Sequence, residues 1–209
     1  MRDFQKPIVQ AYIDATTSAS TGGGGLLEVP CGKGKTVMAL NIISRVGRKT
    51  LVIVHKEFLL NQWIERIEQF LPTAKVGRIQ GQIVDTEGKD IVIGMLQSLS
   101  MKEYPQDLFA QFGLTIIDET HHIAAEVFSR ALFKIVSRHM LGLSATMNRK
   151  DGLTKVFKMF IGDIVYSIKR EDTDEVVVQA LTYETNDDEF NETVYNFKGQ
   201  THYSIMIKK

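Results

Sequence analysis

Cysteine is nearly absent from this sequence, which has Cys31 alone among its 209 residues. A lone cysteine cannot close an intramolecular disulfide, and with five histidines at these spacings it cannot assemble a Cys/His zinc finger. No apolar run approaches the roughly 20 residues that a membrane-spanning helix needs, and the first residues lack the layout of a secretion signal. These absences favour a soluble, intracellular protein in a reducing compartment, with no membrane partner.

The chain also lacks net charge, because 25 Lys and Arg residues balance 25 Asp and Glu residues. The balance hides an asymmetry: residues 1–170 carry 22 basic and 16 acidic side chains, whereas residues 171–209 carry three and nine. An electrostatic footprint for nucleic acid is therefore compatible with the first part and not with the last. The apolar share of 44% is typical of globular domains and excludes collagen-like and wholly disordered chains.

Short apolar strings bounded by glycine, proline or charge recur along the first 170 residues. They lie at 26–29, 51–54, 91–93, 114–117 and 140–143. Strings this apolar are typical of strands that are covered on both faces, as in a parallel sheet. Helical spacing of apolar residues fills intervals at 35–45, 57–70 and 124–137. The alternation predicts an α/β domain over residues 1–170, built from βαβ crossovers.

Three segments depart from this pattern. Residues 16–25 include four consecutive glycines and have no periodicity, so we expect a flexible loop there. Residues 82–90 are expected to form a turn. After residue 170 the composition becomes acidic and polar, and an apolar string at 176–181 predicts a strand that leads into a linker or the start of a second unit.

Residues 29–36, Val-Pro-Cys-Gly-Lys-Gly-Lys-Thr, lie between a predicted strand and a predicted helix. Small residues allow a turn whose backbone N–H groups point at a triphosphate, and the positive end of the following helix adds to the attraction. Gly32 and Gly34 permit the turn, Lys35 reaches the β- and γ-phosphates, and Thr36 places a hydroxyl on Mg²⁺. The first position of the usual pattern, a glycine, is valine here. The segment predicts a site for ATP and Mg²⁺.

The strand predicted at 114–117 runs directly into Asp118 and Glu119. In P-loop enzymes an Asp at such a strand end holds Mg²⁺, and a neighbouring carboxylate can orient and deprotonate the attacking water. We therefore predict Asp118 as a metal ligand and Glu119 as the general base. His121 and His122 follow, but adjacent residues of a helix or strand point apart, which argues against a zinc cage.

These segments, in this order, resemble a known family. Residues 29–36, 116–122 and 142–152 are similar to motifs I, II and III of the superfamily 2 helicases, and residues 2–7 are similar to their Arg-x-Tyr-Gln opening. The narrower likeness is to helicases of the xeroderma pigmentosum group B type and to the transcript-release helicases of large DNA viruses. It is carried by residues 54–57, 62–63, 95–99 and 148–152. The resemblance covers about residues 1–170 and implies a RecA-like P-loop NTPase domain, a mostly parallel sheet flanked by helices.

The resemblance also implies roles for individual residues. Gln5 would read the adenine edge, with Phe4 or Arg2 packing on the ring. The nucleotide loop would comprise Pro30, Cys31, Gly32, Lys33, Gly34, Lys35 and Thr36. His121 would join Lys35, Asp118 and Glu119 in catalysis, and Ser144, Ala145 and Thr146 would link the nucleotide site to the nucleic-acid site. The nucleic-acid backbone would contact His55, Lys56, Gln62, Gln97 and Ser98. Trp63 is interpreted as a core aromatic rather than a base-stacking platform.

Superfamily 2 enzymes bind ATP between two RecA-like domains, and nothing in residues 171–209 resembles motifs IV to VI of the second domain. We therefore expect a longer enzyme, of which this chain alone binds ATP but hydrolyses it weakly, because the second domain supplies a catalytic arginine. The leading hypothesis is a helicase motor acting on DNA rather than RNA. A duplex translocase or restriction-type motor and a regulatory nucleotide-binding module are the alternatives. A virus or phage origin would place the protein in the host cytoplasm or the virion.

Overall fold

The computed structural model describes residues 1–17, 22–105, 107–119, 125–135, 137–146 and 153–168, together with Thr193, Tyr195 and Gly199. The chain divides into two units, Met1–Arg170 and Glu171–Lys209. The helices and strands named below all belong to the first unit. The strand predicted at 176–181 lies outside the described residues.

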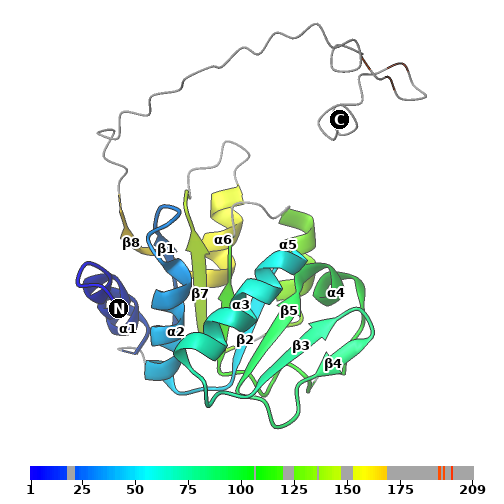
Figure 1. Ribbon diagram of the computed structural model, residues 1–209, viewed down its shortest axis with the longest axis horizontal. Helices are drawn as coiled ribbons and strands as arrows, with labels where there is room; N and C mark the ends of the chain where they lie inside the picture. Colours follow the sequence, from blue (N-terminus) through cyan, green and yellow to red (C-terminus); the bar gives the residue numbers. More distant parts are fainter. Residues whose placement is uncertain are drawn as a thin grey trace, which may run out of the picture. The chain divides into compact units, whose positions relative to one another are not determined.

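Within the described residues, an eight-stranded sheet forms the centre of the first unit, with the strand order β4-β3-β5-β2-β6-β7-β1-β8 (Figure 1). The strands are β1 (Gly23–Glu28), β2 (Thr50–Val54), β3 (Val76–Gln80), β4 (Ile83–Asp85), β5 (Ile91–Met95), β6 (Leu114–Ile117), β7 (His139–Ser144) and β8 (Ile164–Ser167). Only the pairing of β3 with β4 is antiparallel among them. The predicted α/β class with a mostly parallel sheet is confirmed.

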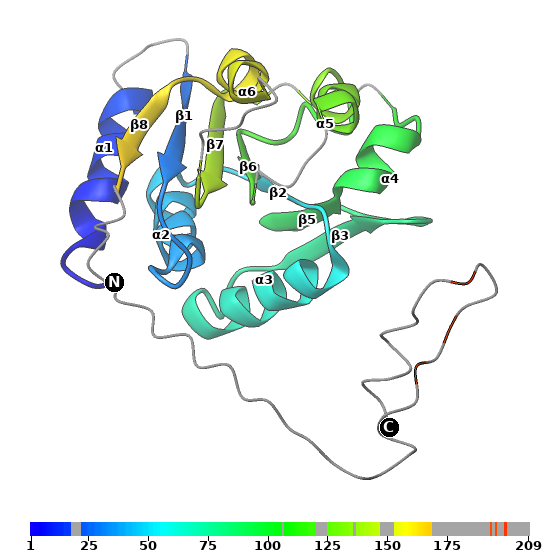
Figure 2. The same ribbon diagram turned by 90° about the horizontal axis from the view of Figure 1, so that it is seen from above.

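Helices cover both faces of this sheet. They are α1 (Gln5–Thr17), α2 (Lys35–Val46), α3 (Glu57–Phe70), α4 (Leu96–Met101), α5 (Ala125–Leu132) and α6 (Leu153–Ile161). Figure 2 shows α1, α2 and α3 on one face and α4, α5 and α6 on the other. None of the described helices is long and apolar enough to cross a membrane.

Each face of the sheet has its own apolar core, which explains why the central strands are continuously hydrophobic. All five residues of β2 are buried, as expected for a strand covered on both sides. Under α1, α2 and α3, the core includes Tyr12, Met38 and Trp63. Under α4, α5 and α6, it includes Phe128 and Phe157, whose rings meet edge to face at 4.6 Å.

Two predictions of irregular structure were wrong. Residues 16–25 are not a loop throughout, because α1 extends to Thr17 and β1 begins at Gly23. The glycines serve close packing: a Cβ atom on Gly24 would lie 1.8 Å from the backbone carbonyl oxygen of Ile161 in α6. Residues 82–90 contain β4, which pairs with β3 after a turn at Gly81, whose φ is 57°. The helix predicted to reach residue 137 ends at Leu132.

Candidate nucleotide-binding site

The carboxyl ends of β1, β7 and β6 lie side by side. Glu28 of β1 pairs with Ser144 of β7, and Gly142 of β7 pairs with Ile117 of β6. Each strand leads directly into one of the predicted motifs, because residues 29–36 follow β1 and Asp118 follows β6. Ligands of parallel sheets bind at this edge. Topology therefore assembles one site from segments about 80 residues apart in the sequence.

Residues 29–36, called the phosphate loop below, turn tightly between β1 and α2. Gly32 and Gly34 have φ values of 79° and 81°, a left-handed conformation that residues with a side chain rarely adopt. Lys35 then opens α2, and Gly34 before it has no side chain with which to cap the helix. The N–H groups of the first helical turn are thus available to an anion, as a phosphate site requires.

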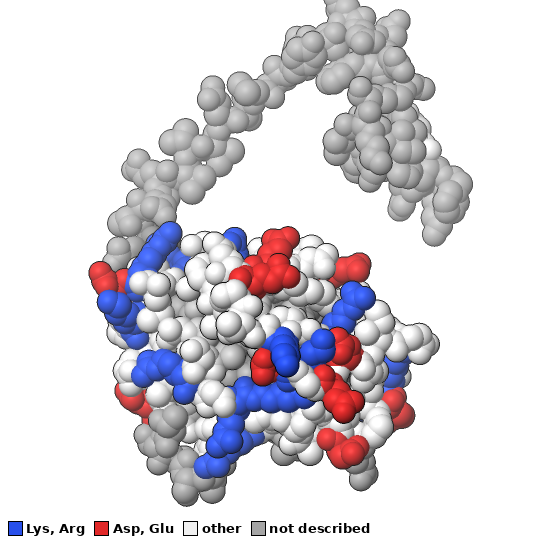
Figure 3. All heavy atoms as spheres, turned by 60° about the horizontal axis from the view of Figure 1, so that its bottom comes forward, with Lys and Arg blue, Asp and Glu red and all other residues white. Residues whose placement is uncertain are grey.

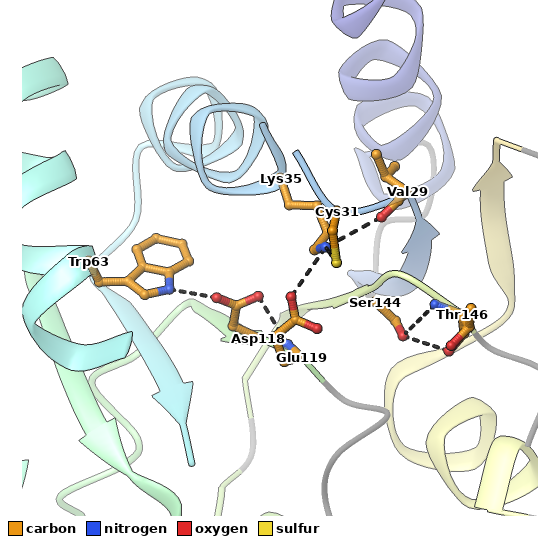
Figure 4. Close-up of polar contacts among 8 residues, drawn as sticks. All are labelled: Val29, Cys31, Lys35, Trp63, Asp118, Glu119, Ser144 and Thr146. Carbon is orange, nitrogen blue, oxygen red and sulfur yellow. Dashed lines mark hydrogen bonds and ion pairs between the residues drawn. The ribbon is translucent and has the colours of Figure 1, made fainter. Parts of the chain in front are cut away.

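Lys35 is held in an ion pair with Glu119 across the strand ends (Figure 4). Its Nζ atom lies 3.2 Å from Oε1 of Glu119 and 3.4 Å from the carbonyl oxygen of Val29, and the Lys35 side chain is only 9% exposed. Cys31 lies at the edge of this group, with its Sγ atom 4.0 Å from Nζ. A buried cation needs a partner. Glu119 supplies that partner here.

Asp118 is more deeply buried than Glu119 and has two donors. Its Oδ2 atom accepts a hydrogen bond of 2.8 Å from Nε1 of Trp63, and its Oδ1 atom accepts one of 3.0 Å from the backbone N–H of Glu119. Burial raises the pKa of Asp118, and the Trp63 hydrogen bond opposes that rise. The nearby Glu119 raises the same pKa further, whereas Lys35 lowers it.

Glu119 itself has a backbone φ of 53°, the left-handed region that disfavours residues with a side chain. Such strain persists where the surrounding structure fixes the conformation, and it recurs at functional sites. In this structure the residue with this conformation is the one whose side chain forms the ion pair with Lys35. His121, the predicted fourth catalytic residue, lies outside the described residues.

A pocket of about 440 Å³ lies between the phosphate loop and the two carboxylates of Asp118 and Glu119. Its walls are Cys31, Gly32, Gly34, Lys35, Thr36, Val37, Leu59, Gln62, Arg66, Phe70, Asp118 and Glu119. The Thr36 hydroxyl and the Asp118 carboxylate therefore share one cavity, and oxygen ligands of this kind are what Mg²⁺ prefers. Because Mg²⁺ usually takes one or two carboxylates and completes its shell with water and substrate phosphate, the residues present fit the predicted ion.

One wall of this pocket comes from α3, which sequence reasoning missed. Gln62, Arg66 and Phe70 are four residues apart and line the cavity together with Leu59. Gln62, predicted to contact nucleic acid, lies on the wall of this pocket, and its contact with nucleic acid stays a prediction. Helical spacing would have grouped these three side chains, although nothing local in the sequence indicates what they face.

The predicted adenine-reading segment lies at the start of α1. Gln5 is buried, and its Nε2 atom donates to the carbonyl oxygen of Lys33 at 2.8 Å. Its Oε1 atom accepts from the backbone N–H of Arg2 at 2.8 Å. Gln5 thereby holds α1 against the phosphate loop, while Phe4 remains 40% exposed beside it. The roles of all three residues toward adenine stay predictions.

Four of the predicted nucleic-acid residues gather at the ends of the neighbouring strands β2 and β5. Nε2 of Gln97 donates to the carbonyl oxygen of His55 at 2.9 Å, which ties α4 to the end of β2. Ser98 accepts a hydrogen bond from the backbone of Gly81, and Lys56 is exposed at the start of α3. On the face shown in Figure 3, basic side chains are interspersed with acidic ones, so charge does not single out that face.

The predicted coupling segment follows β7. Ser144 is fully buried, and its Oγ atom donates to the carbonyl oxygen of Thr146 at 2.7 Å and accepts from the backbone N–H of Thr146 at 3.3 Å. Ala145 is half-buried between them. The segment is a compact turn beside the phosphate loop, since the N–H of Val29 donates to the carbonyl oxygen of Ser144 at 2.8 Å.

A phosphate loop between a strand and a helix, facing an acidic pair at the end of a parallel strand, defines a P-loop nucleoside triphosphatase domain of RecA-like fold. The chain belongs to the family described as "Type III restriction enzyme, res subunit", whose model matches residues 1–149. The predicted likeness to superfamily 2 helicases is thereby confirmed.

Named relatives agree with this membership. The chain is 40% identical to the "Putative ATP-dependent RNA helicase L396" of Acanthamoeba polyphaga mimivirus, over 80% of this chain and 32% of the relative. It is 33% identical to the "DNA 3'-5' translocase XPB2" of Sulfurisphaera tokodaii, over 79% of this chain and 35% of the relative. It thus spans about a third of their length. The crystal structure of the UvsW helicase from bacteriophage T4 shares the fold, with a TM-score of 0.62 and 18% identity over 75% of this chain and 58% of that one.

Proposed function

We propose that this chain is the ATP-binding motor domain of an ATP-dependent helicase or translocase that acts on nucleic acid, with DNA favoured over RNA. The observation that carries the proposal is the pocket in which Lys35, Thr36, Asp118 and Glu119 meet. One named relative is a DNA translocase and another an RNA helicase, so the relatives support nucleic acid as the partner class. The xeroderma pigmentosum group B likeness supports DNA.

The side chains divide the chemistry of ATP hydrolysis among them. The first turn of α2 and the Lys35 ammonium bind the phosphates, and Lys35 exchanges its Glu119 partner for the γ-phosphate. Glu119, released from that ion pair, can orient a water molecule and accept its proton. Thr36 and Asp118 would hold Mg²⁺, which neutralises charge on the phosphate oxygens when bound.

We also propose that a second RecA-like domain, outside this chain, completes the site. The chain spans about a third of the relatives it matches, which leaves room for such a domain in the full-length protein. An arginine supplied from outside is worth about 10³–10⁵ in rate in P-loop enzymes. The 209-residue chain is therefore expected to bind ATP and hydrolyse it slowly.

The test is calorimetric titration of the chain with Mg-ATP, comparing the parent protein with Lys35→Ala. Hydrogen bonds to charged groups contribute about 1.5–3 kcal/mol, so the dissociation constant should rise about 10- to 100-fold. Lys155→Ala is the control, because Lys155 is an exposed lysine of α6 on the other face of the sheet. Parent-like affinity of the Lys35 variant would overturn the site assignment.

Substrate choice needs the full-length protein. Unwinding of tailed DNA and tailed RNA duplexes should be ATP-dependent and faster on DNA. ATP-driven movement on duplex DNA without strand separation would favour the translocase, and ATP binding without any stimulation by nucleic acid would favour the regulatory module.

A further inference from the structure

We propose that Trp63, a residue of helix α3, is a positioning residue for the Asp118 carboxylate. The proposal rests on the proposed function, because Asp118 is taken as the Mg²⁺ ligand of the nucleotide site. Trp63 is the sole tryptophan of the chain, and its side chain is fully buried.

The contact itself goes beyond core packing. A buried indole N–H usually finds a hydrogen-bond partner, and here the partner is the carboxylate at 2.8 Å. Hydrogen bonds to an ionised acceptor are roughly twice as strong as neutral ones. Apolar packing alone requires neither the N–H group nor a charged acceptor, so the volume of the indole does not account for this geometry.

The indole approaches the carboxylate from the protein side. Asp118 lines the 440 Å³ pocket, whereas Trp63 is not among the lining residues. Figure 4 shows the indole N–H directed at one carboxylate oxygen while the backbone of Glu119 approaches the other. Two donors on two different oxygens fix the rotation of the carboxylate, and each oxygen keeps further acceptor capacity for a ligand in the pocket.

The position of Trp63 on α3 gives the contact a second consequence. This helix follows β2 and the exposed Lys56, and the neighbouring Gln62 and Arg66 form part of the pocket wall. A displacement of α3 along its axis would move the indole and the pocket wall together.

The test removes the N–H group and keeps the volume. Because Trp63 is the sole tryptophan of the 209-residue chain, biosynthetic replacement of tryptophan by benzothienylalanine changes one position and puts sulfur in place of the N–H. Trp63→Phe is a genetic variant that also removes the N–H group, although its ring is smaller than the indole. The readout is the ratio of the ATP dissociation constant in EDTA to that in Mg²⁺, measured by calorimetry.

We expect this ratio to fall about tenfold in both proteins, the lower end of the range for hydrogen bonds to charged groups, while affinity in EDTA stays at the parent value. Ile67→Val is the control, since Ile67 is fully buried in the same helix and core but has no polar side-chain atom. Urea unfolding of all variants shows whether each is folded and how much stability it loses.

Each outcome has one meaning. A parent-like ratio in the folded benzothienylalanine protein overturns the role of Trp63 and leaves the proposed function standing. An equal fall in Ile67→Val assigns the effect to packing and also overturns it. A parent protein that binds ATP equally well with and without Mg²⁺ refutes the metal role of Asp118 and this proposal together, and a parent that binds no ATP refutes the proposed function as well.

Discussion

The neighbouring central strands β6 and β7 each have one buried ionisable side chain, at opposite edges of the sheet: Asp118 follows the carboxyl end of β6, and His139 lies at the amino end of β7. The surroundings of the two side chains differ. At the carboxyl end, Asp118 has two hydrogen-bond donors, and Lys35 and Glu119 form an ion pair beside it. At the amino end, His139 opens β7 and lies near the cations of Arg48 and Arg138. Burial, followed by these two cations, lowers the pKa of His139 and so disfavours its protonated form.

The same physics acts at both ends, because burial penalises whichever form is charged. Among the described residues, the buried groups where residues 29–36 meet Asp118 and Glu119 have opposite charges and hydrogen-bond donors beside them. At the amino end, the lowered pKa of His139 instead disfavours its charged form. The contrast indicates that the carboxyl end retains charge for binding a ligand, whereas the amino end serves packing. Three substitutions test this contrast, in decreasing order of expected effect.

Glu119→Gln tests whether the charge at the carboxyl end serves chemistry. A general base typically contributes about 10²–10⁴ in rate, so ATP hydrolysis by the full-length protein should fall by that factor. Binding of Mg-ATP should stay at least as tight as in the parent, because Lys35 no longer has to leave an ion pair. Steady-state phosphate release and calorimetry measure the two quantities.

Glu126→Gln is the matched control, because Glu126 is 76% exposed in α5 and pairs with Arg130 on the surface. It should leave both quantities unchanged. Loss of ATP binding in Glu119→Gln, with the hydrolysis of bound ATP unaffected, would mean that Glu119 supports the pocket rather than the reaction.

Gly24→Ala tests whether the amino ends of the strands serve packing, since Gly24 lies near the amino end of β1 and pairs with Met140 of β7, next to His139. A methyl group there would lie 1.8 Å from the carbonyl oxygen of Ile161, and backbone cannot give way as a flexible side chain can. Overpacking of this kind costs about 1–3 kcal/mol and occasionally more, and we expect the upper end. In Gly23→Ala, the nearest atom, the Cα of Thr16, is 3.4 Å away. Urea unfolding should show a much smaller loss for this neighbour, and equal losses would contradict the packing explanation.

These glycines also show where prediction from the sequence ends. The strands at 51–54 and 114–117 were predicted because burial on both faces demands continuous apolar residues, which a local pattern reveals. Gly24 was predicted as part of a loop because the atom that requires glycine there, the carbonyl oxygen of Ile161 at the end of α6, lies more than 130 residues further along the chain. The sequence did not predict β3 or the edge strand β4, because exposed residues such as Arg78 interrupt their apolar pattern.

In the site, too, the residues of local motifs were predicted from the sequence, whereas a contact that depends on tertiary packing was not. Lys35, Thr36, Asp118 and Glu119 were predicted because each belongs to a short motif whose chemistry depends on adjacent residues. The contact between Trp63 and Asp118 depends on how α3 crosses the ends of other strands, so no local spacing encodes it. The sequence therefore does not predict the residues that support the pocket side chains from behind, such as Trp63, because tertiary packing determines which residues these are.

The smallest expected effect is the pH dependence that His139 gives to stability. The unfolded chain binds a proton on this histidine below about pH 6.5, whereas the folded protein does so only at lower pH, because its pKa is lowered. The unfolded state thus binds more protons between the two pKa values, and the free energy of unfolding must fall as pH decreases through that window. A single proton can contribute at most about 1.4 kcal/mol per pH unit.

His139→Gln, which cannot titrate, should flatten this dependence in urea unfolding at pH 7.5, 6.5 and 5.5 (about one unit apart, to bracket the ordinary pKa). Because the other four histidines are the same in both proteins, the difference between the two pH profiles belongs to His139. Parallel profiles would mean that His139 is protonated equally in both states, and the contrast between the two ends of the strands would then rest on the carboxyl end alone.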